Sequence, residues 1–198
     1  LIHMGGTAAF DHADANLTVS ADETINKSKR DDLVALTSGT VTFTKIEDTY
    51  STLKDMGSLL SGKTVTISDA VTISELADIK TLVGDSGTIA YDIEDTNSVL
   101  SGLTANSGST HTDLTNATSV TISDATTIAD IATIKALNGG GGAAENLPLY
   151  SAITDSAAVL GANTASTSDL MTGKTITLNT NATAAEFRQA ITNRGGGS

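Results

Sequence analysis

One stretch of this sequence matches the pattern of a phosphate-binding loop. Residues 57–64 read GSLLSGKT, in which two glycines separated by four residues precede Lys63 and Thr64. In such loops the backbone amides and the lysine bind nucleotide phosphates, and the loop follows a strand and opens a helix. Here a helix is predicted before the loop and a strand after it. The related stretch 172–175 keeps Gly-Lys-Thr, but Ser168 replaces the first glycine. A helix-to-strand turn is therefore the favoured interpretation.

Acidic side chains recur at the predicted ends of strands, where stacked carboxylates could share a calcium ion. The candidate ligands are Asp69, Asp124, Glu94 and Asp95. The alternative is that these residues cap helices and form turns, which also accounts for their spacing. Neither an EF-hand loop nor a Gly-Gly-x-Gly-x-Asp repeat is present. Calcium is thus the one candidate cofactor, and a purely structural role for these acids stays open.

Catalytic chemistry has little support in the sequence. His3 precedes the repeated pattern, and His12 and His111 lie in loop-like segments outside it. No nucleophile elbow is visible. The absence of cysteine excludes thiol nucleophiles, disulfides and thiolate metal sites. We therefore expect a protein that is not an enzyme.

Threonines at equivalent strand positions predict a ligand face. Thr66, Thr121 and Thr177 are predicted to point outward from their strands, so a stacked sheet would align them in a ladder. A regular ladder of hydroxyl groups is suited to binding ice or carbohydrate. The alternative is an ordinary solvated sheet face, on which threonine is favoured in any case.

These candidate residues lie on a repeated pattern of strands. The sequence Val-Thr-Ile-Ser occurs at 65–68 and 120–123, with related copies at 17–20 and 176–179. Its alternation of apolar and polar residues predicts strands with one buried face. Units of a second kind alternate with these, and their strands end in Ile46-Glu47-Asp48, Ile93-Glu94-Asp95 and Ile153-Thr154-Asp155.

Amphipathic helices are predicted to follow the strands. Residues 72–75 read Thr-Ile-Ser-Glu, which is a capping box, and apolar residues follow at spacings of three and four. Residues 127–130 and 183–186 open helices in the same way, and Gly84 and Gly139 are predicted stops. In the second kind of unit an aspartate is the predicted N-cap, because a leucine follows five residues later; these residues are Asp48, Asp95 and Asp155.

The chain holds seven β-α units of two alternating kinds. One unit cannot bury its own apolar face, so units must stack, with parallel strands on one side and short helices on the other. We predict an α/β repeat solenoid with a leucine-rich-repeat-like shape. A compact α/β domain with one continuous parallel sheet is the alternative. The predicted units are residues 17–38, 41–60, 64–84, 88–103, 119–138, 148–162 and 175–193.

Composition limits the partners of this chain. The formal net charge is −12 and no cluster of lysine and arginine is present, which disfavours nucleic acid and anionic membrane surfaces. No apolar run approaches the roughly 20 residues that a membrane span needs, so no membrane insertion is expected. Self-association is a further expectation, because terminal repeats without polar caps expose apolar edges.

The two ends of the sequence differ from the repeats. Leu1–Gly6 reads LIHMGG and is expected to be a vector-derived scar, whereas Gly195–Ser198 reads GGGS and is expected to be a linker. Between them, residues 7–194 are expected to form a single β-α repeat domain, as a fragment of a longer protein.

Segments such as 120–129 (VTISDATTIA) and 91–96 (YDIEDT) resemble the degenerate repeats of very large bacterial and cyanobacterial cell-surface proteins, including adhesin-like and RTX-associated proteins. The resemblance spans roughly residues 16–192 and carries no catalytic residues. It implies an extracellular or cell-surface location, a structural role as a stalk, spacer or S-layer-like coat, and neighbouring repeats as partners. The alternative function is an adhesive module that recognises glycan or protein through the Thr-rich face or the loops.

Overall fold

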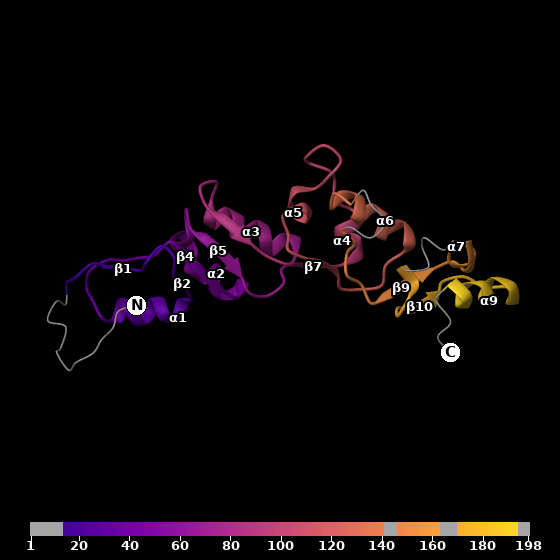
Figure 1. Cartoon of the computed structure of the whole chain (residues 1–198), viewed down its shortest axis with the longest axis horizontal. Coiled ribbons are helices and arrows are strands. Elements are labelled where there is room, and N and C mark those ends of the chain that lie inside the picture. The colour runs from indigo at the N-terminus through magenta and orange to yellow at the C-terminus, as the bar shows by residue number, and fades with distance from the viewer. Residues whose placement is uncertain (1–13, 141–145, 163–169, 194–198) are drawn as a thin grey trace. The chain divides into compact units, whose positions relative to one another are not determined.

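The computed structural model describes residues 14–140, 146–162 and 170–193 (Figure 1). The expected scar, the expected linker, His3 and His12 lie outside these residues. The chain divides into two compact units, one of residues up to Asp69 together with Ala77–Ile89, the other of Ala70–Leu76 together with the residues from Ala90 onward. Both contain helices and parallel strands, which confirms the α/β class predicted from the sequence.

Short strands and helices follow one another along the chain. In the first ninety residues they are β1 (Leu17–Thr18), β2 (Thr24–Ile25), α1 (Lys27–Ala35), β3 (Val41–Thr42), β4 (Lys45–Asp48), α2 (Tyr50–Met56), the 3₁₀ helix η1 (Gly57–Leu60), β5 (Thr64–Ile67), α3 (Ile73–Val83) and β6 (Thr88–Ala90). The later elements are β7 (Ile93–Asp95), α4 (Asn97–Ser101), α5 (Thr112–Thr115), β8 (Val120–Ile122), α6 (Ile128–Leu137), β9 (Ala152–Asp155), α7 (Ala157–Ala162), β10 (Thr175–Leu178) and α9 (Ala184–Asn193). Among the described helices, none is long and apolar enough to cross a membrane.

The strands form several small sheets. In the first unit β1 pairs with β3, and a four-stranded sheet has the order β2-β4-β5-β6. In the second unit β7 pairs with β8, and β9 pairs with β10. All of the strand pairs whose register is defined are parallel. The described strands therefore do not form the single continuous sheet of the alternative prediction.

The register between strands places apolar residues of successive repeats side by side. Ile46 of β4 is opposite Ile25 of β2 on one side and opposite Val65 of β5 on the other. All three side chains are buried, whereas the neighbouring Thr64 is exposed and Thr66 is half-buried. The predicted alternation of buried and solvated positions is thus present in β5, because successive residues of a strand point to opposite faces.

Within each unit the core is built from small aliphatic side chains of helices and strands. The fourth residue of a helix is completely buried in four cases and 1% exposed in a fifth; these residues are Leu53, Leu76, Leu100, Leu160 and Ile131. Buried isoleucine or valine from the strands contributes to the same core. This arrangement follows from the composition, since only 3% of the residues are aromatic and small aliphatic side chains must fill the interior.

Two predicted local signals set the limits of α3. Thr72 and Glu75 form the predicted capping box: Thr72 Oγ1 accepts a hydrogen bond from the Glu75 amide at 3.2 Å, and the Thr72 amide donates to Glu75 Oε2 at 2.9 Å. After the helix, Gly84 has a φ of +69°, a left-handed conformation that favours glycine. The helix therefore begins and ends where local residue types predict.

Candidate functional site

The stretch that matches a phosphate-binding loop is a turn between a helix and a strand. Helix α2 precedes it, the 3₁₀ helix η1 forms its first four residues, and β5 begins at Thr64, which is the reverse of the order that phosphate binding needs. The amide of Gly62 donates to the Val83 carbonyl at 2.9 Å, and the amide of Lys63 donates to the Leu60 carbonyl at 3.0 Å. These backbone donors are therefore engaged by carbonyl groups, which supports the turn interpretation.

Lys63 and its counterpart Lys174 make a cation–π contact with an aromatic residue of the preceding repeat. Lys63 Nζ lies 5.3 Å from the centre of the Phe43 ring. Lys174 Nζ lies 4.7 Å from the centre of the Tyr150 ring and also donates to the Tyr150 carbonyl at 2.8 Å. The lysine of the Gly-Lys-Thr sequence shared by the two turns thus has a structural role, because its ammonium group contacts an aromatic residue of the adjacent repeat.

Asp95 connects two helices rather than one. It is only 8% exposed, and its two carboxylate oxygens accept different backbone hydrogen bonds. Oδ1 accepts from the amide of Thr96, just before α4, at 2.8 Å. Oδ2 accepts at 3.0 Å from the amide of Ile73, the first residue of α3 in the preceding repeat. One carboxylate therefore binds the start of its own helix and the start of the helix before it.

The same arrangement occurs at two equivalent aspartates. Asp48 accepts from the amide of Thr49 and from the amide of Lys27 at the start of α1, both at 3.0 Å. Asp155 accepts from the adjacent Ser156 amide at 2.8 Å and from the amide of Ile128 at the start of α6 at 3.2 Å. The contact is thus a property of the repeat and not of one position.

Aspartates that follow strands of the other kind make half of this contact. Asp69 Oδ1 accepts from the amide of Tyr50, the first residue of α2, at 2.7 Å. Asp124 Oδ1 accepts from the amide of Asn97, the first residue of α4, at 2.6 Å. Five helices therefore have their first amide bound by a carboxylate of the following repeat. We call these five contacts the inter-repeat caps, made by Asp48, Asp69, Asp95, Asp124 and Asp155.

The inter-repeat caps suit the electrostatics of a helix. The first amides of a helix lack partners within it, and the N-terminus carries a partial positive charge that attracts a carboxylate. The structure corrects the prediction that Asp48, Asp95 and Asp155 are N-caps of their own helices. The N-cap position of α2 belongs to Thr49 and that of α4 to Thr96, and each aspartate lies one residue earlier.

The four calcium candidates are not brought together as one site. Asp69, Asp95 and Asp124 each bind a different helix start, and Glu94 is exposed opposite Thr121 of β8. Among the described residues, no group of three or more acidic or histidine side chains could hold a metal ion. The geometry therefore favours the capping role for these acids, and calcium binding stays a prediction.

The three threonines of the predicted ligand face have different neighbours. Thr66 is opposite Glu47, Thr121 is opposite Glu94, and Thr177 is opposite Thr154. Glutamate therefore alternates with threonine across the first two strand pairs. A hydroxyl pair occurs only at the third of these positions, where Thr177 is exposed. These pairings make the solvated face a mixture of carboxylates and hydroxyl groups.

His111 has a structural position among the described residues. It is 9% exposed, its amide donates to the Leu137 carbonyl at 2.8 Å, and its Nδ1 accepts from the Asp113 amide at the start of α5. The segment is also held by Tyr91, whose hydroxyl group donates to the Asp113 carbonyl at 3.0 Å. These contacts give the histidine a role in shaping the insertion between the fourth and fifth repeats.

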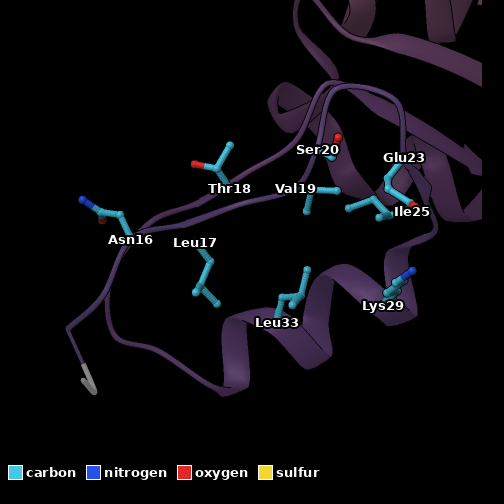
Figure 2. Close-up of a pocket in the computed structure, with 9 residues that line it drawn as sticks. All are labelled: Asn16, Leu17, Thr18, Val19, Ser20, Glu23, Ile25, Lys29 and Leu33. Atoms are coloured by element: carbon cyan, nitrogen blue, oxygen red, sulfur yellow. The ribbon is translucent and has the colours of Figure 1, made fainter. Parts of the chain in front are cut away.

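A cavity of about 570 Å³ lies between the β1 segment and α1 (Figure 2). Leu17, Val19 and Ile25 point into it from the strand side, and Leu33 points into it from the helix. The walls are mainly aliphatic, so the cavity offers apolar surface rather than a set of reacting groups. It lies between the strand and the helix of the first repeat, where apolar core side chains are incompletely covered.

Comparisons of the chain with protein-family models, with curated proteins and with solved structures found no match. The inter-repeat caps were missed from the sequence, although a signal for them was present. Each repeat from the second to the sixth has an aspartate at or just after the end of a strand, whichever kind of helix follows. That regularity indicates a contact common to both kinds of unit.

Proposed function

We propose that this chain is a structural repeat segment of a large extracellular bacterial surface protein, where it acts as a stalk, spacer or coat module. In this proposal its seven β-α units form a solenoid. The inter-repeat caps carry the proposal, because each one satisfies a backbone amide of one repeat with a side chain of the next. A repeat is therefore incomplete by itself, as expected for an array whose units depend on their neighbours.

Two other repeated contacts support the same role. Parallel pairing joins strands of successive repeats, and the buried fourth residue of each of five helices recurs at the same place. None of these contacts gathers nucleophiles, acids or metal ligands at one point. Their common effect is to hold each repeat on the next, which is the property that a spacer requires. The acidic net charge of −12 favours solubility at a cell surface.

The adhesive alternative has one observation in its favour. The insertion between the fourth and fifth repeats is held in a defined conformation by His111 and by the hydroxyl group of Tyr91. Loops that a scaffold holds in place are common positions for ligand recognition. In this second proposal the insertion, rather than the strand face, would contact a glycan or protein.

Small-angle X-ray scattering tests the solenoid. A compact domain of this length has a radius of gyration of about 16 Å. Strands pack about 4.8 Å apart and helices about 9 Å apart. Seven stacked units would therefore curve and extend over roughly 60 Å on the helix side. We expect a radius of gyration clearly above the compact value and a skewed distance distribution.

The measurement should be made on the Phe187→Asp variant at several dilutions, so that association between copies does not lengthen the particle. A symmetric distance distribution with the radius of a compact sphere would overturn the solenoid. Binding of a glycan or protein that is lost when residues 104–110 are replaced by a short Gly-Ser linker would favour the adhesive alternative over the spacer.

A further inference from the structure

The last repeat has an uncovered apolar face. Phe187 of α9 is 51% exposed and Ile191 is 45% exposed. Together with Ala190 and with Ile176 and Leu178 of β10, they line a shallow groove of about 250 Å³. A strand and a helix both contribute to the groove, as they do to the packing between repeats. We call this surface the tail face.

Equivalent residues in interior repeats are buried. Phe187 is the fourth residue of its helix, as are Leu76, which is completely buried, and Ile131, which is 1% exposed. In β8, the residues that correspond to Ile176 and Leu178 are Val120 at 4% and Ile122 at 2% exposure. The tail face therefore corresponds to the packing surface of the interior repeats, but its side chains are exposed.

The eighth residue of α9 extends this surface. It is Ile191 in the last repeat, whereas the corresponding position is Lys80 in α3 and Lys135 in α6. Isoleucine thus stands where the two interior helices have a lysine, which makes this position of α9 more apolar. The last repeat is thus suited to contact and not to solvent.

The first repeat has a complementary opening. Leu17, Val19 and Leu33 surround the cavity of about 570 Å³, and Thr18 points away from it (Figure 2). Leu17 and Val19 correspond to Val65 and Ile67, which are 0% and 4% exposed in the third repeat. Here the corresponding side chains are only half-buried. We call the cavity and its rim the head face.

We propose that the tail face of one copy of this chain docks on the head face of a second copy, so that the repeat packing continues from one molecule to the next. The inference rests on the proposed structural function. Its basis is that the residues of both faces correspond to residues that pack between repeats inside the chain. Docking of the two faces would therefore repeat a contact that the chain already makes. The cavity in the head face is large enough to accept the Phe187 side chain of the partner.

The strand edges fit this docking mode. Among the described strands, β10 pairs only with β9, and β1 pairs only with β3. Each therefore has one edge whose amides and carbonyls are available to a further strand, and strand addition is a common mode of protein association. Because head and tail are different surfaces, the contact is heterologous and generates open chains rather than closed dimers.

Sedimentation velocity with complementary variants tests the proposal. Phe187→Asp blocks the tail face and Leu33→Asp blocks the head face. Val159→Asp and Val34→Asp are matched controls, because these valines are 41% and 39% exposed and line neither face. Circular dichroism and thermal melting establish that each variant is folded, and Leu17→Asp replaces Leu33→Asp if the latter is not.

The expected result is a series of oligomers in the wild type and in both controls that grows with protein concentration. Salt should favour the oligomers, since each copy carries a net charge of −12 and repulsion between copies is screened. Each blocked variant alone should be monomeric. A mixture of the two should form a dimer and nothing larger, because only one unblocked head and one unblocked tail remain.

Three outcomes would overturn the docking proposal. They are a wild type that stays monomeric at all concentrations, a blocked variant that still forms long oligomers, and a mixture that contains no dimer. Dimers formed by Leu33→Asp alone would indicate tail-to-tail contact and would equally reject it. None of these results changes the scattering of the monomer, so failure of the docking proposal is distinguishable from failure of the solenoid.

Discussion

Asp95 Oδ2 accepts a hydrogen bond at 3.0 Å from the backbone amide of Ile73, a residue 22 positions earlier in the chain. The carboxylate is almost fully buried, and the amide is the first of helix α3. Two consecutive repeats are therefore joined at a point where a helix would otherwise leave a donor without a partner.

We expect Asp95→Ala to lower the free energy of unfolding by about 2 kcal/mol, because two backbone amides lose a charged acceptor in a buried position. Urea unfolding followed by circular dichroism measures the change. Glu94→Ala is the matched control: it removes an exposed carboxylate from the adjacent residue, and its effect should be within about 0.5 kcal/mol. Equal effects of the two substitutions would contradict the inter-repeat cap.

A smaller loss is expected for Asp124→Ala. Asp124 accepts one backbone hydrogen bond, from Asn97, and its side chain is exposed, so solvent replaces much of what is removed. The expected cost is about 1 kcal/mol, in the usual range for removal of a helix cap. The ratio of the Asp95→Ala and Asp124→Ala effects under identical urea conditions is the decisive quantity. A larger loss of stability for Asp124→Ala than for Asp95→Ala would show that the exposure of the aspartate does not determine how much its cap stabilises the protein.

Calcium is expected to leave the melting temperature unchanged. The three candidate aspartates are engaged at helix starts and not grouped around a common point. The comparison is thermal melting in millimolar calcium and in EDTA, since millimolar calcium saturates most extracellular calcium modules. A bound ion would raise the melting temperature by linkage. A calcium-dependent rise that disappears in Asp69→Asn or Asp124→Asn would restore the calcium hypothesis.

Alkaline pH is expected to destabilise the protein through two tyrosines. Burial raises the pKa of Tyr91 to about 12, with a further contribution from the nearby Asp113 carboxylate. Burial also raises the pKa of Tyr150 to about 12. An unfolded tyrosine loses its proton near pH 10, whereas the folded one keeps it. The unfolded state is then favoured increasingly, so stability falls as the pH rises from about 10 to about 12.

Urea unfolding at several pH values across this range, together with ultraviolet titration of the phenol groups, measures this effect. The double variant Tyr91→Phe and Tyr150→Phe should have a flatter dependence on pH. It should also be less stable near neutral pH, because the two hydroxyl groups donate to the carbonyls of Asp113 and Leu170. An equally steep loss of stability in the double variant would assign the alkaline transition to other groups.

Local features of the fold were predictable from short-range patterns. The alternation in Val65–Ser68 predicted a strand with one buried face, because side chains of a strand point alternately to its two sides. The capping box of Thr72 and Glu75 predicted the start of α3, and Gly84 predicted its end. These signals depend only on residues within one turn or one strand, so the sequence contains all the information they need.

The role of the aspartates was not predictable in this way. In Asp95-Thr96 either side chain is suited to cap the helix that follows, and a spacing argument assigned the aspartate to its own helix. The actual acceptor geometry involves Ile73 of another repeat. The sequence alone therefore determined local features such as the buried face of β5 and the limits of α3. Only the tertiary structure decided which helix each carboxylate binds, because that depends on the register in which successive repeats pack.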